Sequence, residues 1–330
     1  MLKPRPLLEV NAQGLYCAAG DFYIDPWRKV ARAVITHAHS DHAKPGSAHY
    51  LCCSEGLQVL RARMGKSAII ETLPYGQALT IGDVILSFHP AGHILGSAQV
   101  RLEYKGEIWV VTGDYKREVD RVCTPFEPVK CHTLITESTF GLPIFNWPTS
   151  ETVFDSIHQW WQAQSALGLN CVISAYSLGK AQRLLSGLHP EMGPIYVHPT
   201  IQNMNDAYQR SGIRLPACKT IAEGTIRGAM IIAPPGTMDS EWGQRFGEVR
   251  TAFASGWMAV RNMRNRSHCN TRFVLSDHAD WKGLLTSIQE SEAQQVLVTH
   301  GYTQHLVRYL NETGIAAREL KTEFEGEAEA

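Results

Sequence analysis

Four potential metal ligands stand close together near the start of the sequence, directly after the apolar segment AVIT. They are His37, His39, Asp41 and His42. Imidazole and carboxylate groups are good ligands for zinc and similar divalent ions, and one ion needs three or four of them. Surface histidines in a polar loop are the alternative, but four donors in six positions favour a metal site. The H-x-H-x-D-H spacing divides the four donors into two pairs, one for each of two ions.

Turn and helix patterns in the first 140 residues indicate how this loop would be positioned. Apolar runs in this part are short and rich in β-forming residues, which predicts strands. Gly82-Asp83 and Lys105-Gly106 lie between such runs and predict hairpin turns. The segment SEGLQVLRARMG predicts a helix with Ser54 as its N-cap and Gly65 as its C-terminal stop. A strand that ends before His37 would present the four donors at the edge of a sheet.

Helical and strand-like segments alternate after about residue 145. The segment TSETVFDSIHQWWQAQSALG is typical of a helix and precedes the strand-like NCVISAY, and SLGKAQRLLSGLH and GPIYVHP repeat this order. This alternation predicts a parallel α/β unit. Two more strand–helix pairs follow from about residue 270. The acidic tail, residues 321–330, is expected to be disordered.

The bulk composition is that of an ordinary globular protein. The 330 residues are enough for two domains, 44% of them are apolar, and the formal net charge is −1. Any nucleic-acid surface would therefore be a local basic patch. The eight cysteines are scattered and form no C-x-x-C pair, which predicts reduced thiols. The start lacks a signal-peptide pattern and no long apolar span is present, so we expect a cytoplasmic protein.

The H-x-H-x-D-H loop resembles the signature of the metallo-β-lactamase superfamily, and further residues match that family in order. Asp25, at the end of FYID, matches an early structural aspartate, although Asp21 is a second candidate. His93 in PAGHILGSA, Asp114 in VVTGDY and His300 in VLVTHG match the remaining ligand positions. A single histidine at a strand end is more often structural than ligating. Together, and in this order, these residues form a specific pattern.

The resemblance implies a site for two divalent ions, with zinc as the first expectation and manganese as the alternative. One ion would be held by His37, His39 and His93, the other by Asp41, His42 and His300, and Asp114 would bridge both. Asp25 would orient the ligands without binding a metal itself. Two ions about 3.5–4 Å apart lower the pKa of a shared water and offset charge on the attacking and leaving oxygens. This arrangement suits phosphodiester hydrolysis.

Three further features resemble the β-CASP nuclease branch of this superfamily. Glu137 in LITESTFG matches its acidic motif, and His278 in FVLSDHADW matches its strand-end histidine, which can protonate a leaving oxygen. Glu137 would orient His278, although a structural carboxylate is the alternative. The segment VTHG is the third feature. The implied α/β fold is an αββα sandwich formed by residues 1–143 and 266–320, with an inserted α/β cap at residues 144–265.

Within this branch the chain most resembles the bacterial ligase-associated DNA exonucleases, through segments such as GLYCAAGDFYIDPW, VITHAHSDHA, FASGWM and LSDHADW. The resemblance implies a DNA exonuclease that acts on single-stranded or overhanging ends in DNA repair, with a DNA ligase and a helicase as candidate partners. A histidine at position 300 is more typical of RNA-cutting members, so an RNA 3′-end processing nuclease is the alternative. A small-ester or lactam hydrolase would not explain the cap, and a non-enzymatic scaffold would not explain the complete ligand set.

A local excess of positive charge precedes His278 in the sequence. Residues 241–272 contain six arginines and two glutamates, and arginine clusters commonly contact phosphates. We expect Arg261, Arg264 and Arg266 to hold the polynucleotide backbone, with a solvated charged face as the alternative. Lys180 in YSLGKAQ opens an expected helix, and helix N-termini bind phosphate well, so Lys180 is a further candidate.

Overall fold

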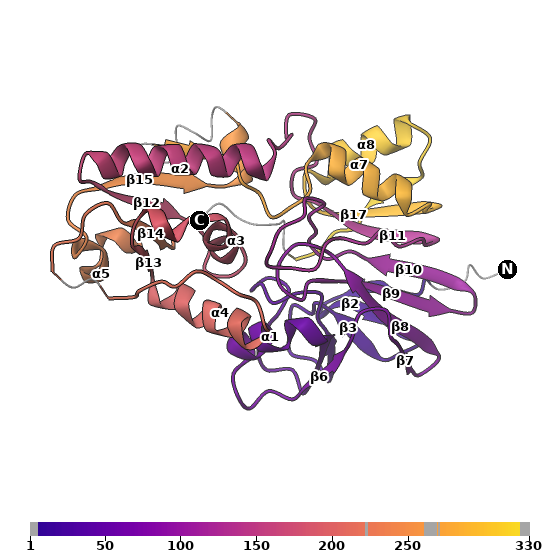
Figure 1. Cartoon of the computed structure of the whole chain (residues 1–330). Helices are drawn as coiled ribbons and strands as arrows, with labels where there is room; N and C mark the ends of the chain where they lie inside the picture. Colours follow the sequence, from indigo (N-terminus) through magenta and orange to yellow (C-terminus); the bar gives the residue numbers. More distant parts are fainter. Residues whose placement is uncertain (1–5, 222–223, 261–268, 270, 324–330) are drawn as a thin grey trace. The chain divides into compact units, whose positions relative to one another are not determined.

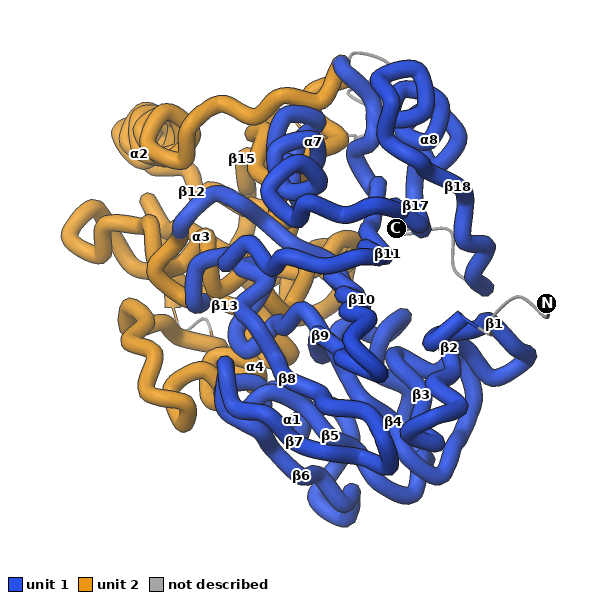
Figure 2. The backbone as a smooth tube through the Cα atoms, turned by 90° about the vertical axis from the view of Figure 1, so that its right-hand side faces the viewer, with its two compact units in different colours: residues 1–119, 123–143, 278–329 blue, residues 120–122, 144–277, 330 orange. Residues whose placement is uncertain are grey.

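The computed structural model describes residues 6–221, 224–260, 269 and 271–323 (Figure 1). The chain divides into two compact units (Figure 2). Unit 1 comprises residues 1–119, 123–143 and 278–329, and unit 2 comprises residues 120–122, 144–277 and 330. The chain therefore leaves unit 1 and returns to it, and residues distant in the sequence share one unit.

The first sheet of unit 1 has six strands in sequence order. Strands β1 to β3 pair antiparallel, and β3 to β6 pair parallel. The 3₁₀ turn Ser54–Gly56 and helix α1 (Leu57–Met64) connect β5 to β6, and Gly65 ends the helix as expected. The expectation that Ser54 is the N-cap is wrong, because Ser54 lies inside the 3₁₀ turn and Gly56 precedes the first residue of α1. The strands are β1 (Glu9–Asn11), β2 (Gly14–Cys17), β3 (Phe22–Ile24), β4 (Arg32–Val34), β5 (His49–Cys53) and β6 (Ile70–Leu73).

The second sheet of unit 1 has seven strands in the order β18-β17-β11-β10-β9-β8-β7. Both expected hairpins are confirmed, because Ile81 pairs with Val84 across one turn and Tyr104 with Glu107 across the other. Strands β10, β11, β17 and β18 run parallel. The strands are β7 (Ala78–Ile81), β8 (Val84–Pro90), β9 (Ala98–Tyr104), β10 (Glu107–Val111), β11 (Thr133–Ser138), β17 (Gln295–Gly301) and β18 (Ala317–Glu319).

Apolar side chains hold the layers of unit 1 together. Residues such as Val34 and Cys53 of the first sheet share one buried cluster with Leu86 and Val100 of the second, so the two sheets pack face to face. Helices α7 (Trp281–Glu290) and α8 (Thr303–Glu312) bury residues including Ile288 and Leu306 against β10, β11 and β17. Burial of this apolar area, worth about 25 cal/mol per Å², is the main force that holds the strand ends in place.

Unit 2 is built around a sheet of five parallel strands in the order β13-β14-β12-β15-β16. Strands and helices alternate from residue 150 to residue 254, which confirms the expected α/β rhythm. The strands are β12 (Asn170–Ser174), β13 (Ile195–Val197), β14 (Met230–Ala233), β15 (Val249–Ala254) and β16 (Thr271–Phe273), and the helices are α2 (Ser150–Ala166), α3 (Lys180–Gly187), α4 (Pro199–Arg210) and α5 (Glu241–Gln244). Short 3₁₀ turns span Pro190–Met192, Thr237–Asp239 and Gly256–Ala259.

The end of unit 2 differs from the boundary expected at residue 265. Strand β16 pairs parallel with β15, so the run that begins at Thr271 completes the sheet of unit 2, and the unit ends at Asp277. The apolar run and the helix after it, expected as one pair, are thus divided between the units. Of the expected acidic tail, residues 324–330 lie outside the described residues. No helix in the described part of the chain is long and apolar enough to cross a membrane.

Candidate metal centre

The ends of several strands of unit 1 supply the side chains of the candidate centre. The loop with His37, His39, Asp41 and His42 follows β4, and the loop with His93 follows β8. Asp114 follows β10, and Glu137 and His300 lie near the ends of β11 and β17. Neighbouring parallel strands end at the same edge of a sheet, so β10, β11 and β17 bring three of these side chains to one edge.

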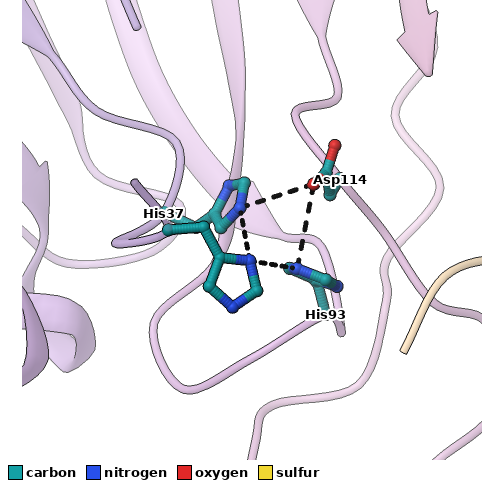
Figure 3. A group of neighbouring side chains, drawn as sticks. His37, His93 and Asp114 are labelled. Carbon is teal, nitrogen blue, oxygen red and sulfur yellow. Dashed lines mark hydrogen bonds and ion pairs between the residues drawn. The ribbon is translucent and has the colours of Figure 1, made fainter. Parts of the chain in front are cut away.

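Three imidazoles and one carboxylate converge in the first donor group, which consists of His37, His39, His93 and Asp114. One ligand atom from each residue lies within 4.8 Å of the others. His39 Nδ1 is 3.2 Å from His37 Nε2 and 3.0 Å from His93 Nε2. Asp114 Oδ2 is 3.5 Å from His37 Nε2 and 3.9 Å from His93 Nε2 (Figure 3). Three nitrogens and one oxygen in this arrangement form a donor set that zinc accepts.

Asp114 also belongs to a second donor group, with His42 and His300. Its Oδ2 is 3.5 Å from His42 Nε2, and its Oδ1 is 3.9 Å from His300 Nδ1. Asp41, expected as a ligand here, places Oδ2 3.6 Å from His42 Nε2 but is not a member of the mutually close group. The structure therefore brings all seven expected ligands into one region, with Asp114 common to both groups.

Two buried atoms of the second group fit a metal ion. His42 Nε2 and Asp114 Oδ1 are buried, and neither has a hydrogen-bond partner among the described residues. Buried polar atoms in native proteins nearly always have a partner, so two such atoms in one donor group require an explanation. A divalent cation would satisfy both of them. The nitrogen and oxygen donors of the two groups fit zinc and also admit manganese.

Asp25 fixes the orientation of His42 and of the loop that carries it. Its Oδ2 lies 2.7 Å from His42 Nδ1 and accepts a hydrogen bond from the Thr36 hydroxyl at 2.6 Å, while its Oδ1 accepts from Thr36 N at 2.8 Å. A carboxylate on one ring nitrogen sets the tautomer that leaves the other nitrogen available to a metal. Asp21 instead accepts from the Tyr16 hydroxyl at an exposed position. Asp25, and not Asp21, is thus the carboxylate that hydrogen-bonds to a candidate ligand.

The two donor groups differ in the charge state of their histidines. Burial and the neighbouring His42 hold the pKa of His37 well below its usual value, so the ring stays neutral, as a ligand must be. Burial would lower the pKa of His42, but the carboxylates of Asp114, Asp41 and Asp25 raise it well above its usual value. Burial opposes ionisation of Asp114, yet His42 and His300 hold its pKa well below the usual range. The second group therefore favours a positive charge, which the protonated His42 ring carries without a metal and which a cation would supply once that proton has left.

A β-bulge places His300 at the site. In the pairing of β11 with β17, Glu137 is opposite Thr299 and Ser138 is opposite Gly301, so His300 is the extra residue. Its φ of 57° lies in the left-handed region, which is uncommon outside glycine. The Ser138 hydroxyl donates to the His300 carbonyl and holds this backbone shape. Bulges turn a side chain away from the regular pleat, and here the turned ring faces Asp114.

His278 and Glu137 form a buried pair beside the first donor group. His278 Nδ1 lies 2.9 Å from Glu137 Oε2 and 3.1 Å from Oε1. Glu137 also accepts from Tyr115 N at 2.7 Å and from the Thr139 hydroxyl at 2.5 Å. The His278 ring centroid is 4.7 Å from that of His93. Since Glu137 engages Nδ1, Nε2 is the nitrogen that His278 has for exchanging a proton.

The structure describes only one of the four residues expected to contact nucleic acid, which is Lys180. Arg261, Arg264 and Arg266 lie outside the described residues. Lys180 is only 5% exposed, and its ammonium pairs with Asp277 at 3.0 Å and donates to the Leu275 carbonyl at 3.2 Å. The expectation that Lys180 binds phosphate is not supported, because its charge is already neutralised inside unit 2.

The sequence reasoning did not single out the side chains that support the ligands. Thr36 links Asp25 to His37, since its hydroxyl is 2.6 Å from Asp25 Oδ2 and 3.1 Å from His37 Nδ1. Thr139 holds Glu137 through its hydroxyl. Both threonines lie within two residues of a predicted site residue, which is the only signal in the sequence that could have identified them.

No protein-family model matches the chain. Comparisons with known proteins do find relatives, some of which match most of the chain and others only part of it. A curated protein of Opitutus terrae named a probable DNA ligase is 33% identical over 309 residues, which are 93% of this chain and 30% of that protein. The endoribonuclease ysh1 of Aspergillus fumigatus is 33% identical over 156 residues, 43% of this chain and 17% of that protein. Cleavage and polyadenylation specificity factor 73 of Drosophila melanogaster is 36% identical over 129 residues, 38% of this chain and 18% of that protein.

A solved structure shares the fold. It is a protein of unknown function from Enterococcus faecalis V583, with a TM-score of 0.59 at 12% identity over 90% of this chain and 80% of that one. This likeness shows the fold alone. The chain spans no more than 30% of the length of the three curated relatives named above, so their names describe proteins much longer than the matched part.

Proposed function

We propose that the chain is a two-metal phosphodiesterase, and more narrowly a DNA exonuclease that acts on single-stranded or overhanging ends in DNA repair. The observation that carries the proposal is the sharing of Asp114 between two donor groups, with the His278–Glu137 pair beside them. Relatives named endoribonuclease support nucleic acid as the substrate class. Unit 1 would be the metallo-β-lactamase core, and unit 2 the β-CASP cap.

Each group of side chains has a role in this proposal. His37, His39, His93 and Asp114 would hold one ion, and Asp41, His42 and His300 together with Asp114 would hold the second. When bound, two such ions lower the pKa of water and stabilise charge on the attacking and leaving oxygens of a phosphodiester. Asp25 keeps Nε2 of His42 directed at the centre by binding Nδ1. Zinc is the first expectation for both positions, and manganese is the alternative.

His278 would act as the general acid. Glu137 binds Nδ1 and stabilises a positive charge on the ring, so a proton can be held at Nε2. Transfer of this proton to the leaving oxygen would prevent an alkoxide from leaving with full negative charge. Glu137 itself is held by Tyr115 N and the Thr139 hydroxyl, which leaves it little freedom to rotate. Glu137 is therefore a positioning residue for His278.

Two observations bear on whether the substrate is DNA or RNA. The match to the protein named a probable DNA ligase extends over 93% of this chain, whereas the match to the endoribonuclease extends over 43%. The broader match favours DNA, and it also supports a DNA ligase as a partner, together with a helicase by resemblance. His300, however, is present in the second donor group, and the partial match includes RNA-cutting proteins. An RNA 3′-end processing nuclease is therefore the second candidate.

The deciding experiment compares substrates with and without ends. Purified protein is loaded with zinc or manganese. It is given matched end-labelled single-stranded DNA and RNA, circular single-stranded DNA, a p-nitrophenyl ester of a carboxylic acid, and a β-lactam. We expect mononucleotides from linear DNA and no cleavage of circles. Faster cleavage of RNA, or internal cuts in circles, would favour the processing nuclease. Turnover of the ester or the lactam alone would refute phosphodiesterase activity. The His39→Ala variant, purified in parallel, excludes a contaminating nuclease.

A further inference from the structure

A cluster of buried charges in unit 2 surrounds the segment that leads directly into His278. Lys180 and Arg183 come from one face of helix α3 and are 5% and 1% exposed. Both bind the carboxylate of Asp277, Lys180 Nζ at 3.0 Å from Oδ2 and Arg183 Nη1 at 3.2 Å from Oδ1. Asp277 is itself 4% exposed and immediately precedes His278. The residue next to the proposed general acid is thus held by two cations.

The same two cations also hold the backbone of this segment. Lys180 donates to the Leu275 carbonyl at 3.2 Å, and Arg183 donates to the Ser276 carbonyl. Three consecutive residues, Leu275 to Asp277, are therefore bound by side chains of α3. Charge-assisted bonds of this kind are about twice as strong as neutral ones and fix geometry at both ends. The path of the chain up to His278 is set by the helix.

Arg183 reaches two other segments that belong to unit 2 near the places where the chain crosses between the units. Its Nε lies 3.8 Å from Asp120 Oδ2, and its Nη2 donates to the Ser150 hydroxyl at 2.8 Å. Residues 120–122 are a short excursion from unit 1, six residues after Asp114, and Ser150 follows the crossing at residues 143–144. One guanidinium thus contacts the short segment 120–122 and residues near both ends of the long segment 144–277.

Stability alone is a weak reason for such a cluster. Removing charges from water costs several kcal/mol per ion, and well-packed apolar residues in place of a buried ion pair are often equally or more stabilising. Apolar residues are buried close by, with Leu184 and Leu185 of the same helix and Leu275 of the bound segment in one cluster. Buried charges are retained in several systems because they specify one geometry, and position is what a general acid requires.

We propose that Lys180, Arg183 and Asp277 are positioning residues, which lock residues 275–277 so that His278 is held in register with Glu137 for proton transfer. This inference rests on the proposed role of His278 as general acid. The contacts described above for these three residues, named here the α3 clamp, are with residues of unit 2 and include no member of either donor group. They would act on the reaction only through the placement of His278.

The test uses two variants of the metal-loaded 330-residue chain, Asp277→Asn and Lys180→Met, which keep side-chain size and remove charge. Glu248→Gln is the matched control, because Glu248 forms an exposed ion pair with Arg250 in the same unit. Turnover is measured on an oligonucleotide, whose leaving oxygen needs a proton, and on a p-nitrophenyl phosphodiester, whose leaving group does not. Metal content and thermal unfolding are measured alongside.

We expect both clamp variants to keep their metal and to lose about 100-fold in kcat on the oligonucleotide, the usual cost of a small misplacement of a catalytic group. KM and turnover of the p-nitrophenyl diester should change by only a few-fold, and Glu248→Gln should match the wild type. Equal losses on both substrates, or loss of metal, would overturn the proposal, since either would indicate general damage rather than misplacement of His278.

Amide hydrogen exchange of the metal-free protein supplies a readout independent of activity. The peptide covering residues 274–280 should exchange at least about tenfold faster in both clamp variants, with little change in the rest of unit 2. Unchanged exchange in this peptide would refute the clamp even if activity fell. If the wild type cleaves no phosphodiester, the proposed function fails, and the exchange result alone decides whether α3 holds the segment before His278.

Discussion

At the scale of single residues, Asp114 has the central place in the candidate centre. It contributes Oδ2 to the group with His37, His39 and His93, and it is shared with the group of His42 and His300. The other ligands each belong to one group only. Removing Asp114 should therefore affect both ions, whereas removing a histidine should affect one. This asymmetry makes the arrangement testable by metal stoichiometry.

We expect Asp114→Asn to lose most of the metal that the wild type carries, which should be about two equivalents per chain. His300→Ala should retain about one equivalent, because the four-membered group is intact. His305→Ala is the matched control, since His305 is exposed and not a member of either group. Metal analysis after extensive dialysis measures the difference. Equal metal content in Asp114→Asn and wild type would show that Asp114 is not a shared ligand.

Metal content also distinguishes a general acid, the role proposed for His278, from a metal ligand, the role proposed for His300. His278→Ala should keep its full metal content and lose about 10²–10⁴ in turnover, the usual contribution of an acid–base group. A substrate with a p-nitrophenolate leaving group should recover much of this loss, because it departs without a proton. Steady-state kinetics on the two substrates measures the recovery. Loss of one metal equivalent in His278→Ala would instead make His278 a ligand, through the group it forms with Asp114 and Glu137.

At the scale of secondary-structure elements, the bulge between β11 and β17 directs His300 toward Asp114. The bulge depends on Gly301, whose φ is +73°. A Cβ at this position would lie 2.4 Å from the Ser138 carbonyl oxygen and 2.5 Å from Thr139 Cα. Both neighbours are backbone atoms, which cannot move away without disturbing the end of β11.

Gly301→Ala should therefore lower both stability and metal content. Gly314→Ala is the matched control, because Gly314 has φ +88° but a Cβ there would have no neighbour within 4 Å. The control should cost about 1–2 kcal/mol from the left-handed backbone alone and should keep its metal. Gly301→Ala should cost clearly more and lose the ion bound by His300. Chemical denaturation and metal analysis test this, and identical behaviour of the two variants would exclude a role for the bulge.

At the scale of the whole molecule, the two units each have their own apolar core, and buried thiols contribute to both. Cys53 lies in the core of unit 1, and Cys171 lies fully buried in the core of unit 2. Burial raises the pKa of Cys53 to about 11 and that of Cys171 to about 12. Unfolding returns a thiol to an ordinary pKa of about 8.5.

Alkaline pH should therefore destabilise the protein in part through Cys171. A group whose pKa is higher in the folded state stabilises fully below the unfolded pKa and loses that contribution as pH rises toward the folded pKa. We expect the stability advantage of wild type over Cys171→Ala to be constant from pH 6 to 8. Above pH 9 it should shrink by about 1.4 kcal/mol per pH unit. Urea unfolding at several pH values measures this, and parallel curves up to pH 11 would contradict it.

Much of the local structure followed from the sequence because it depends on neighbours in the chain. The two hairpins are fixed by turn residues between β-rich runs, and the end of α1 is fixed by Gly65. The H-x-H-x-D-H loop indicated a metal site because its donors are only a few positions apart. His93, Asp114 and His300 were placed with them by resemblance to a family, not by any local pattern.

Only the tertiary structure decided which distant side chains meet. His93 lies 54 residues beyond His39, and Glu137 lies 141 residues before His278, yet each pair is within about 3 Å. The assignment of β16 to unit 2, the bulge at His300 and the buried pairing of Lys180 were also outside the reach of sequence patterns. Each depends on which strand or helix lies alongside in space, and long-range packing of apolar faces sets that neighbour rather than local propensity. The chain thus specified its ligand types and their strand-end positions, while the packing of the sheets determined their distances.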